Sequence, residues 1–356
     1  MNRSEYFGLI EKLVMAHAPS GNEREIDEVL QGELARRSLK AEQDAAGNLI
    51  VLRRGESSKR AIGVTAHKDE IGMIVKRIEE DGKLRITNIG GSRPWVYGEG
   101  VVDVLGDREV VSGILSAGSR HVSAESAEVF AAKNTHALDW TMVWIETKLD
   151  PEELDARGVH IGTKAVIGRH RKRPFQLGEY LCGYGLDCKV GVAILLNVLD
   201  GLKTAKLPHD VYFLFTAAEE TGVQGAVWGA HQLPIETLIA LEVGPVAPEY
   251  QIENTEIPVL LYRDSGAVYS EQVNGDLTAL AKGLGFGVQP ACLTSFGSDA
   301  SFTAKYGHMP RVACLCYPTE NTHGYEICSW AGIKNTARLL TEYLTRRTEW
   351  GMGNGE

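Results

Sequence analysis

Hydrophobic positions near the N-terminus follow a helical spacing. Residues 4–18 and a second segment that ends near residue 37 repeat apolar residues every three or four positions, the pattern of amphipathic helices. A Pro-Ser-Gly break at residues 19–21 separates the two segments, and Ser20 or Asn22 is expected to cap the second helix. Apolar, β-branched runs at residues 48–52 and 61–66 then predict buried strands.

Helix and strand patterns alternate again beyond residue 185. The expected elements are a buried helix at 192–202, a strand at 211–216, helices at 225–230 and 278–284, a strand at 238–243, a helix that begins at 297–300, a strand at 311–316 and a last helix at 331–346. Such alternation predicts an α/β domain in which helices cover a doubly wound sheet.

The stretch between these two parts has another character. Short alternating runs are separated by Gly, Asp and Asn turns, and Asp81-Gly82 is a hairpin signal. The strand-like runs are 74–78, 84–86, 101–104, 110–115, 140–147 and 164–167, with short helical candidates at 123–133 and 151–157. We therefore predict a first catalytic segment at 1–72, a small β-barrel insert at 73–167 and a second catalytic segment at 168–356.

Composition narrows the class of protein. The chain has 356 residues, 44% hydrophobic and 24% charged, with a formal net charge of -10 and a pI near 5.6. This acidic balance argues against a nucleic-acid partner or an anionic membrane partner. The basic cluster at residues 169–173 is expected to be a solvated loop.

Targeting signals are not apparent in the sequence. Charged residues interrupt the N-terminal apolar pattern, and no run reaches the ~20 apolar residues of a membrane span. Six cysteines without a CxxC pair give neither a disulfide framework nor a thiolate metal site. We expect a cytoplasmic protein.

Acids and histidines stand where the predicted strands end. The run at 211–216 leads into Glu219 and Glu220, and because successive side chains of an extended chain point in opposite directions, the two acids are expected to have different roles. A doubly wound sheet binds ligands at the carboxyl ends of its strands. His67 and Glu242 also stand at the ends of predicted strands, Asp187 precedes a predicted helix, and His323 lies in the loop after the strand at 311–316.

Five of these residues match the ligands of a two-metal site: His67, Asp187, Glu220, Glu242 and His323. Two divalent ions need a shared carboxylate, further ligands for each ion and a base beside the water that lies between them. Glu219, which is adjacent to a candidate ligand, is the expected base. Imidazole and carboxylate ligands favour zinc, cobalt or manganese. Each residue also has a simpler interpretation: Asp187 as a helix cap, His67 as a core histidine, the Glu219-Glu220 pair as a helix start. Glu242, a charge within an apolar strand, is the hardest to explain without a ligand.

The order of these motifs resembles a known family. AHKDEIG at 66–72, LDCKVG at 186–191, TAAEETG at 216–222, ALEV at 240–243 and NTH at 321–323 are similar to the signatures of the tetrahedral aminopeptidases, glutamyl-aminopeptidase-like enzymes with two metals, some of them catalogued as cellulases. The resemblance covers nearly the whole chain. It implies a mixed-sheet α/β/α domain, with the β-rich insert as a PDZ-like dimerisation domain in a twelve-subunit tetrahedral particle.

The resemblance also implies a role for each site residue. Asp187 becomes the bridging ligand. His67 and Glu242 complete the ligand set of one metal, and Glu220 and His323 complete that of the other. Glu219 becomes the general base and Asp69 the residue that holds the His67 imidazole. Two positions depart from the family: Glu242 stands where Asp is usual, and Cys188 where Asp or Asn is usual.

The predicted function is removal of N-terminal residues from peptides, with Glu219 deprotonating a water that bridges the two metals. A carboxypeptidase or amide deacylase is the rival among metal hydrolases, and the longer Glu242 lends it some weight. A glycosidase would use two carboxylates without metal. A peptide-binding scaffold would have no need of Glu219.

Overall fold

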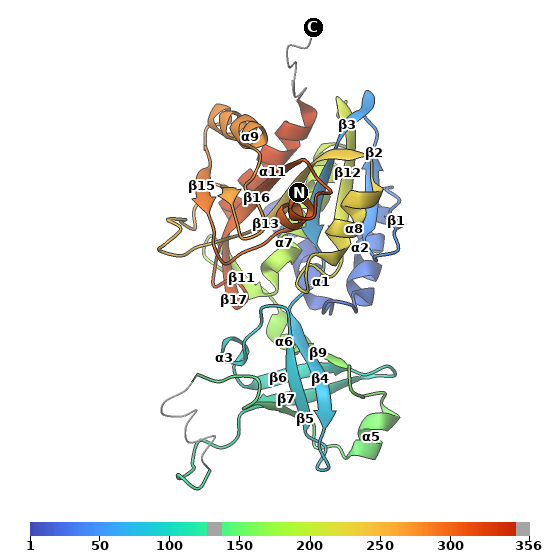
Figure 1. Ribbon diagram of the computed structural model, residues 1–356, viewed down its shortest axis with the longest axis vertical. Coiled ribbons are helices and arrows are strands. Elements are labelled where there is room, and N and C mark those ends of the chain that lie inside the picture. Colours follow the sequence, from blue (N-terminus) through green and yellow to red (C-terminus); the bar gives the residue numbers. More distant parts are fainter. Residues whose placement is uncertain (127–136, 347–356) are drawn as a thin grey trace.

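The computed structural model describes residues 1–126 and 137–346, which form two units (Figure 1). An α/β unit contains both ends of the described chain, and a β-barrel lies beside it. The chain enters the barrel after the strand that carries His67 and returns to the α/β unit before Asp187. The α/β unit is therefore assembled from two separate segments of sequence.

An eleven-stranded sheet is the centre of the α/β unit, with the path order β1-β2-β12-β3-β13-β16-β17-β11-β10 and with β14 and β15 beside β16. β12, β3, β13 and β16 run parallel, and the outer strands are mostly antiparallel. Its strands are β1 (Glu42–Gln43), β2 (Leu49–Arg53), β3 (Ser57–His67), β10 (Phe175–Leu177), β11 (Tyr180–Tyr184), β12 (His209–Thr216), β13 (Ile235–Pro245), β14 (Val259–Arg263), β15 (Gln289–Cys292), β16 (Arg311–Glu320) and β17 (Tyr325–Ser329).

Helices cover both faces of this sheet. The helices of the described chain are α1 (Arg3–Met15), α2 (Arg24–Arg36), α3 (Pro94–Tyr97), α5 (Pro151–Ala156), α6 (Arg169–Lys172), α7 (Leu186–Gly201), α8 (Gln224–Gln232), α9 (Glu271–Gly283), α10 (Asp299–Lys305) and α11 (Trp330–Thr345). Side chains of α1, α7, α9 and α11 share one core, and those of α8 and α10 share the other. The predicted mixed-sheet α/β/α fold is confirmed.

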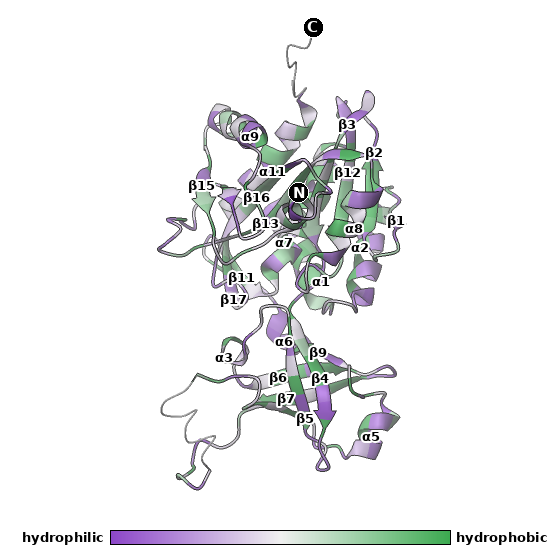
Figure 2. Ribbon diagram, in the orientation of Figure 1, coloured by the Kyte–Doolittle hydropathy of each residue, from purple (hydrophilic) through white to green (hydrophobic). Residues whose placement is uncertain are grey.

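The central strands are apolar along their whole length because both of their faces are buried. In β12, Val211 and Phe213 pack in the core beneath α7, whereas Tyr212 and Leu214 pack in the core on the opposite face. Figure 2 shows this concentration of hydrophobic residues in the central strands. A continuous apolar run is the pattern expected of such a strand.

The barrel is closed by six antiparallel strands in the order β4-β5-β8-β7-β6-β9. They are β4 (Gly72–Ile78), β5 (Leu84–Ile89), β6 (Gly100–Leu105), β7 (Val110–Ser116), β8 (Trp144–Glu146) and β9 (Lys164–Ile167). Its own hydrophobic core includes Val75, Ile86 and Val104. The predicted barrel is thus confirmed, and the expected hairpin at Asp81-Gly82 joins β4 to β5.

Other local predictions are corrected. Helix α2 has Glu23 at its N-cap and no side-chain cap bond, so neither Ser20 nor Asn22 caps it. Strands β1, β10, β11, β14, β15 and β17 were not predicted. Most of the helix expected at 123–133 lies outside the described residues. Within the described ranges, every helix is too short or too polar to cross a membrane.

The basic cluster at 169–173 is not a solvated loop. Residues 169–172 form α6, and Lys172 is 1% exposed. Its Nζ donates to both carboxylate oxygens of Glu70, at 2.7 and 2.9 Å. Glu70 Oε1 also accepts from the Ala18 backbone N–H. A buried ion pair therefore joins the chain leaving the barrel to the strand end that carries His67.

Candidate active site

The candidate site lies at the carboxyl ends of the parallel strands, where a sheet of this kind leaves a crevice. β3 ends at His67, and β13 carries Glu242 near its end. Glu219 and Glu220 follow β12 in a turn. All these side chains are at least partly buried, and His67 and Glu242 are fully so.

Asp187 lies between the two histidines. Its Oδ1 is 3.1 Å from His67 Nε2, and its Oδ2 is 3.4 Å from His323 Nε2. Each carboxylate oxygen therefore faces a different imidazole. The α7 stretch is kinked at Asp187 and Cys188, and the Asp187 oxygens face the two imidazoles, not the first backbone N–H groups of the helix. The helix-cap interpretation of Asp187 is wrong.

The adjacent acids Glu219 and Glu220 face different histidines. Glu219 Oε2 lies 4.0 Å from His67 Nε2, and Glu220 Oε2 lies 3.5 Å from His323 Nε2. Strand alternation is the wrong reason for this divergence, because β12 ends at Thr216 and Ala218 has a positive φ of 51°. The turn, not the pleat, separates the two side chains.

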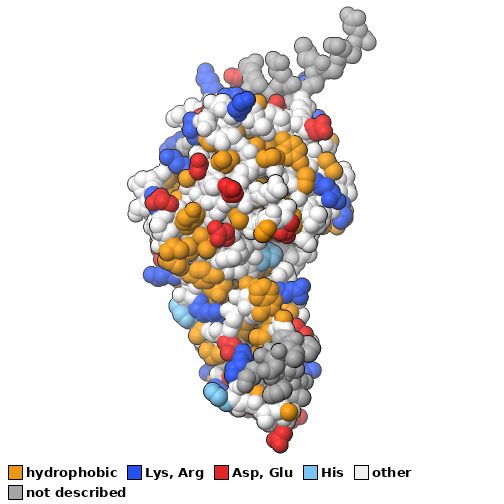
Figure 3. Space-filling model, turned by 90° about the vertical axis from the view of Figure 1, so that its left-hand side faces the viewer, with side chains coloured by type: hydrophobic (Ala, Val, Ile, Leu, Met, Phe, Trp, Pro, Cys, Tyr) orange, Lys and Arg blue, Asp and Glu red, His pale blue; other side chains and the backbone are white. Residues whose placement is uncertain are grey.

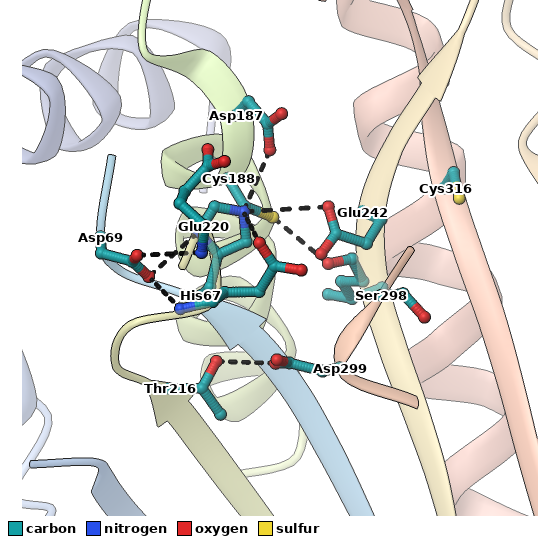
Figure 4. A network of polar contacts seen from close by, with 12 residues as sticks. His67, Asp69, Asp187, Cys188, Thr216, Glu220, Glu242, Ser298, Asp299 and Cys316 are labelled. Carbon is teal, nitrogen blue, oxygen red and sulfur yellow. Dashed lines mark hydrogen bonds and ion pairs between the residues drawn. The ribbon is translucent and has the colours of Figure 1, made fainter. Parts of the chain in front are cut away.

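Glu242 and Cys188 lie on the side of His67 that faces away from Asp69 (Figure 4). Glu242 Oε2 is 3.9 Å from His67 Nε2. The Cys188 thiol donates a 3.2 Å hydrogen bond to the Leu241 carbonyl, and burial followed by the Glu242 charge raises the pKa of Cys188 well above its usual range. These contacts favour a neutral thiol that packs beside the site.

Asp69 supports three parts of the site at once. Its Oδ1 lies 3.4 Å from His67 Nδ1, the ring nitrogen away from Asp187. The Glu219 and Glu220 backbone N–H groups donate to its carboxylate at 3.0 and 3.2 Å, and the Ser20 hydroxyl donates at 2.6 Å. A buried carboxylate with these partners fixes both an imidazole and the turn that carries the two acids.

Glu326 is a site residue that the sequence analysis missed. This buried side chain on β17 accepts hydrogen bonds from the backbone N–H groups of Leu186 at 2.6 Å, Asp187 at 3.1 Å and His323 at 3.3 Å. It therefore fixes the positions of Asp187 and His323 relative to each other. The sequence marks Glu326 in the same way as Glu242, because each is an acid among apolar residues of a strand.

The barrel also contributes to the site. Gly90, with a φ of 70°, and Gly91 follow β5 and lie against the metal-ligand candidates. A side chain at position 91 would collide with the His323 ring, and one at position 90 would crowd Glu220 and Ile71. Glycine is required at these positions because the barrel backbone passes directly over two site residues.

The charges of the site are poorly compensated by protein groups. Burial, with repulsion from Asp187, raises the pKa of Glu220 to about 7, and burial raises that of Glu242 well above its usual range. Burial opposes protonation of His67, but the Glu242 charge and the Asp187 contact outweigh it and raise the pKa of His67. In the part of the chain that is described, no lysine or arginine pairs with Asp187, Glu220 or Glu242.

This donor set fits divalent cations. Three groups offer ligand atoms within 4.8 Å of one another: His67, Asp187, Cys188 and Glu242 in the first, His67, Glu219 and Glu220 in the second, and Asp187, Glu220 and His323 in the third. The first and third groups share Asp187. A cation in each would supply the charge compensation that the buried acids lack.

A further buried acid, Asp299, lies beneath the site. The Thr216 hydroxyl donates to Asp299 Oδ2 at 2.7 Å (Figure 4). Asp299 begins α10 and is 1% exposed, and burial raises its pKa to about 6. Its charge and that of Glu220 add to the effect of burial in raising the pKa of Glu219. The helix start that the sequence predicted thus also shapes the electrostatics of the site.

Comparison with known proteins agrees with this geometry. The family model for M42 glutamyl aminopeptidase matches residues 47–339. A protein of Acetivibrio thermocellus named as a candidate aminopeptidase is 27% identical over 97% of this chain and 100% of its own length. Two solved structures have the same fold. An aminopeptidase from Desulfurococcus kamchatkensis has a TM-score of 0.87 and 24% identity, over 97% of this chain and 96% of its own. The PhTET1-12s dodecamer has a TM-score of 0.85 and 25% identity, over 98% of this chain and 100% of its own.

The family match covers most of the chain, including every candidate ligand, and the fold and the buried acid-imidazole cluster agree with it. The chain therefore belongs to the M42 glutamyl aminopeptidase family of metal-dependent peptidases.

Proposed function

We propose that this chain is an aminopeptidase that removes N-terminal residues from peptides with two divalent ions at the described site. His67 and Glu242 would hold one ion and Glu220 and His323 the other, with Asp187 shared between them. The observation that carries the proposal is the position of Asp187, whose two oxygens face two different imidazoles within two groups of possible ligands.

Glu219 has the position and the environment of a general base. Its carboxylate lies beside both ligand groups and is largely buried, and its pKa is raised well above the usual range. A buried carboxylate whose pKa is raised can accept a proton from the attacking water and return it to the leaving amine. The bound ions, when present, lower the pKa of that water and polarise the scissile carbonyl. Asp69 keeps the Glu219 backbone and the His67 ring in place during proton transfer.

Zinc is the metal that we propose, with cobalt or manganese as alternatives. Two imidazoles and three carboxylates suit all three ions, and the Cys188 thiol is not needed as a ligand. We also propose that residues 1–72 and 168–356 act as the catalytic domain and 73–167 as an insert. The six cysteines are all free, which supports a reducing cytoplasmic location.

The proposal is tested by metal content and activity measured on the same preparation. Metal-saturated protein is expected to contain two divalent ions per chain by elemental analysis and to hydrolyse free-amine aminoacyl substrates, with both lost on chelation. N-blocked peptides should not be cleaved. Cleavage of N-blocked peptides would indicate a carboxypeptidase or deacylase instead, and activity that survives removal of the metal would exclude the metallopeptidase.

Assembly into a homo-oligomer, specifically a tetrahedral dodecamer, is the second part of the proposal. Large hydrophobic side chains are exposed near the junction of the two units, among them Trp95, Phe175 and Leu177 at 61%, 46% and 58% exposure. Figure 3 shows hydrophobic side chains gathered over that junction. Such patches mark protein interfaces, and the similar PhTET1-12s peptidase is a dodecamer.

Light scattering tests the assembly. The protein is expected to run as a particle of twelve chains, and joint replacement of Trp95 and Leu177 by serine should give smaller particles because both side chains lie exposed at the proposed contact. Replacement of Tyr306, which is 56% exposed on the α/β unit, provides a matched control. Monomeric wild-type protein would contradict the proposal.

A further inference from the structure

We propose that the N-terminal residue taken by this enzyme has an uncharged, apolar side chain. The inference rests on the proposed aminopeptidase function, because it concerns the pocket beside the reacting carbonyl. That carbonyl must lie at the acid-imidazole cluster. The side chain of the first residue must therefore enter a cavity that opens directly from the cluster.

Three cavities border the cluster. The reaction cavity, of about 320 Å³, is lined by the five candidate ligands and the candidate base Glu219, together with Val223 and Phe302. A cavity towards the barrel holds only about 20 Å³ and is lined by the Glu70–Lys172 ion pair. That space admits about one water molecule and no side chain. The third cavity, of about 410 Å³, is large enough for any amino-acid side chain.

This third cavity, here called the side pocket, begins at the cluster. Asp187 and His323 line both this pocket and the reaction cavity, as do Ser295 and Phe296. A substrate whose carbonyl lies beside Asp187 thus has the side pocket within reach of its first side chain. The reaction cavity is left for the remainder of the peptide.

Six of the eleven residues that line the side pocket are apolar, and apart from Asp187 and His323 the others are uncharged. The apolar residues are Val243, Pro245, Val246, Ala247, Tyr250 and Phe296, with Ser295, Asn321 and Thr322 as the uncharged polar members. Val246, Tyr250 and Phe296 also pack against the core beneath α8 and α10, which holds the wall in place. A pocket whose wall is built from apolar and uncharged polar groups selects side chains by shape and by burial of hydrophobic area.

Apart from Asp187 and His323, which belong to the acid-imidazole cluster, the lining residues of the side pocket carry no charge. Among its lining residues there is no lysine or arginine, so a glutamyl side chain would lose water without gaining a cation. The one lining acid, Asp187, already faces both imidazoles, so its charge is not free for a lysyl or arginyl group. The pocket therefore favours residues such as leucine, methionine or phenylalanine over glutamate, although the family is described by a glutamyl activity.

Hydrolysis of a panel of aminoacyl p-nitroanilides tests the inference. For metal-saturated enzyme, kcat/KM for the best of the leucyl, methionyl and phenylalanyl substrates is expected to exceed that for the glutamyl, aspartyl, lysyl and arginyl substrates by about tenfold or more. A charged residue as the best substrate would overturn the inference and leave the aminopeptidase function standing. Failure to hydrolyse any substrate of the panel would overturn the proposed function and the inference with it.

A pair of variants tests the pocket itself. Ala247→Lys places a cation in the lining on a loop that follows β13, whereas Gln251→Lys adds the same charge on an exposed position of the same loop that does not line the pocket. The ratio of glutamyl to leucyl kcat/KM should rise about tenfold in the first variant and stay constant in the second. An unchanged ratio in both, or an equal change in both, would assign specificity to another surface.

Discussion

Glu219→Gln should leave a protein that binds its metals and its substrate but hardly turns over. The amide keeps the shape of the side chain and a hydrogen-bonding oxygen, but it cannot accept a proton from water. General-base assistance is worth roughly a hundred- to ten-thousand-fold, so kcat should fall by about that factor while KM changes little. Metal content should remain at the wild-type value because Glu219 is not one of the proposed ligands.

Steady-state kinetics and elemental analysis on the same sample distinguish this result from a structural defect. Glu220→Gln provides the matched control, since it makes the same chemical change one residue away and faces His323 instead of His67. It should lose one ion per chain because a neutral amide is a poorer ligand than a carboxylate. Near-normal kcat in Glu219→Gln, or equal metal loss in the two variants, would refute the separate roles.

Asp187→Asn should have the larger effect on metal binding, with both ions lost. One Asp187 oxygen faces His67 and the other faces His323, and an amide nitrogen in place of either oxygen offers no lone pair to a cation. Activity should fall to background at any metal concentration that saturates the wild-type enzyme. Competitive binding of zinc against a chromophoric chelator measures both sites.

The comparison with Glu220→Gln makes this prediction specific. A shared ligand affects two sites, whereas Glu220 belongs to the cluster around His323 and to the cluster with Glu219, not to that of Glu242. If Asp187→Asn retained one tightly bound ion, Asp187 would be a ligand of a single site and the proposed arrangement would need another shared group.

The parts of the fold that were predictable are those in which sequence pattern and burial agree. β12 and β13 are buried on both faces, so their apolar runs were visible, and the acid of Glu242 stood out against its surroundings. Glu326 carries an equivalent charge, but β17 alternates over only five residues beside a loop, and no strand was predicted there. A buried acid marks both strands, but β17 is too short for its apolar pattern to be recognised, so Glu326 was missed.

Contacts between segments that are far apart in the sequence could not be predicted from the local pattern of residues. Lys172 stands in a run of basic residues, and nothing near it in sequence shows that its partner is the buried Glu70. Gly90 and Gly91 could be recognised as a turn, but their closeness to Glu220 and His323 depends on how the barrel docks. The divergence of Glu219 and Glu220 was expected for the wrong reason, because the positive φ at Ala218 is set by the turn, not by the strand.

The first and last strands of the barrel are neighbours: β4 pairs with β9, with Met73 opposite Ala165. Once the barrel has formed, the two points where the chain leaves and rejoins the α/β unit are held close together. The entropy of closing a long loop between β3 and the later parallel strands is then largely paid within the barrel, which forms from contiguous sequence. A folded insert thus behaves as a short connection. The long insertion therefore adds little to the entropy cost of pairing β3, which ends at His67, with β12.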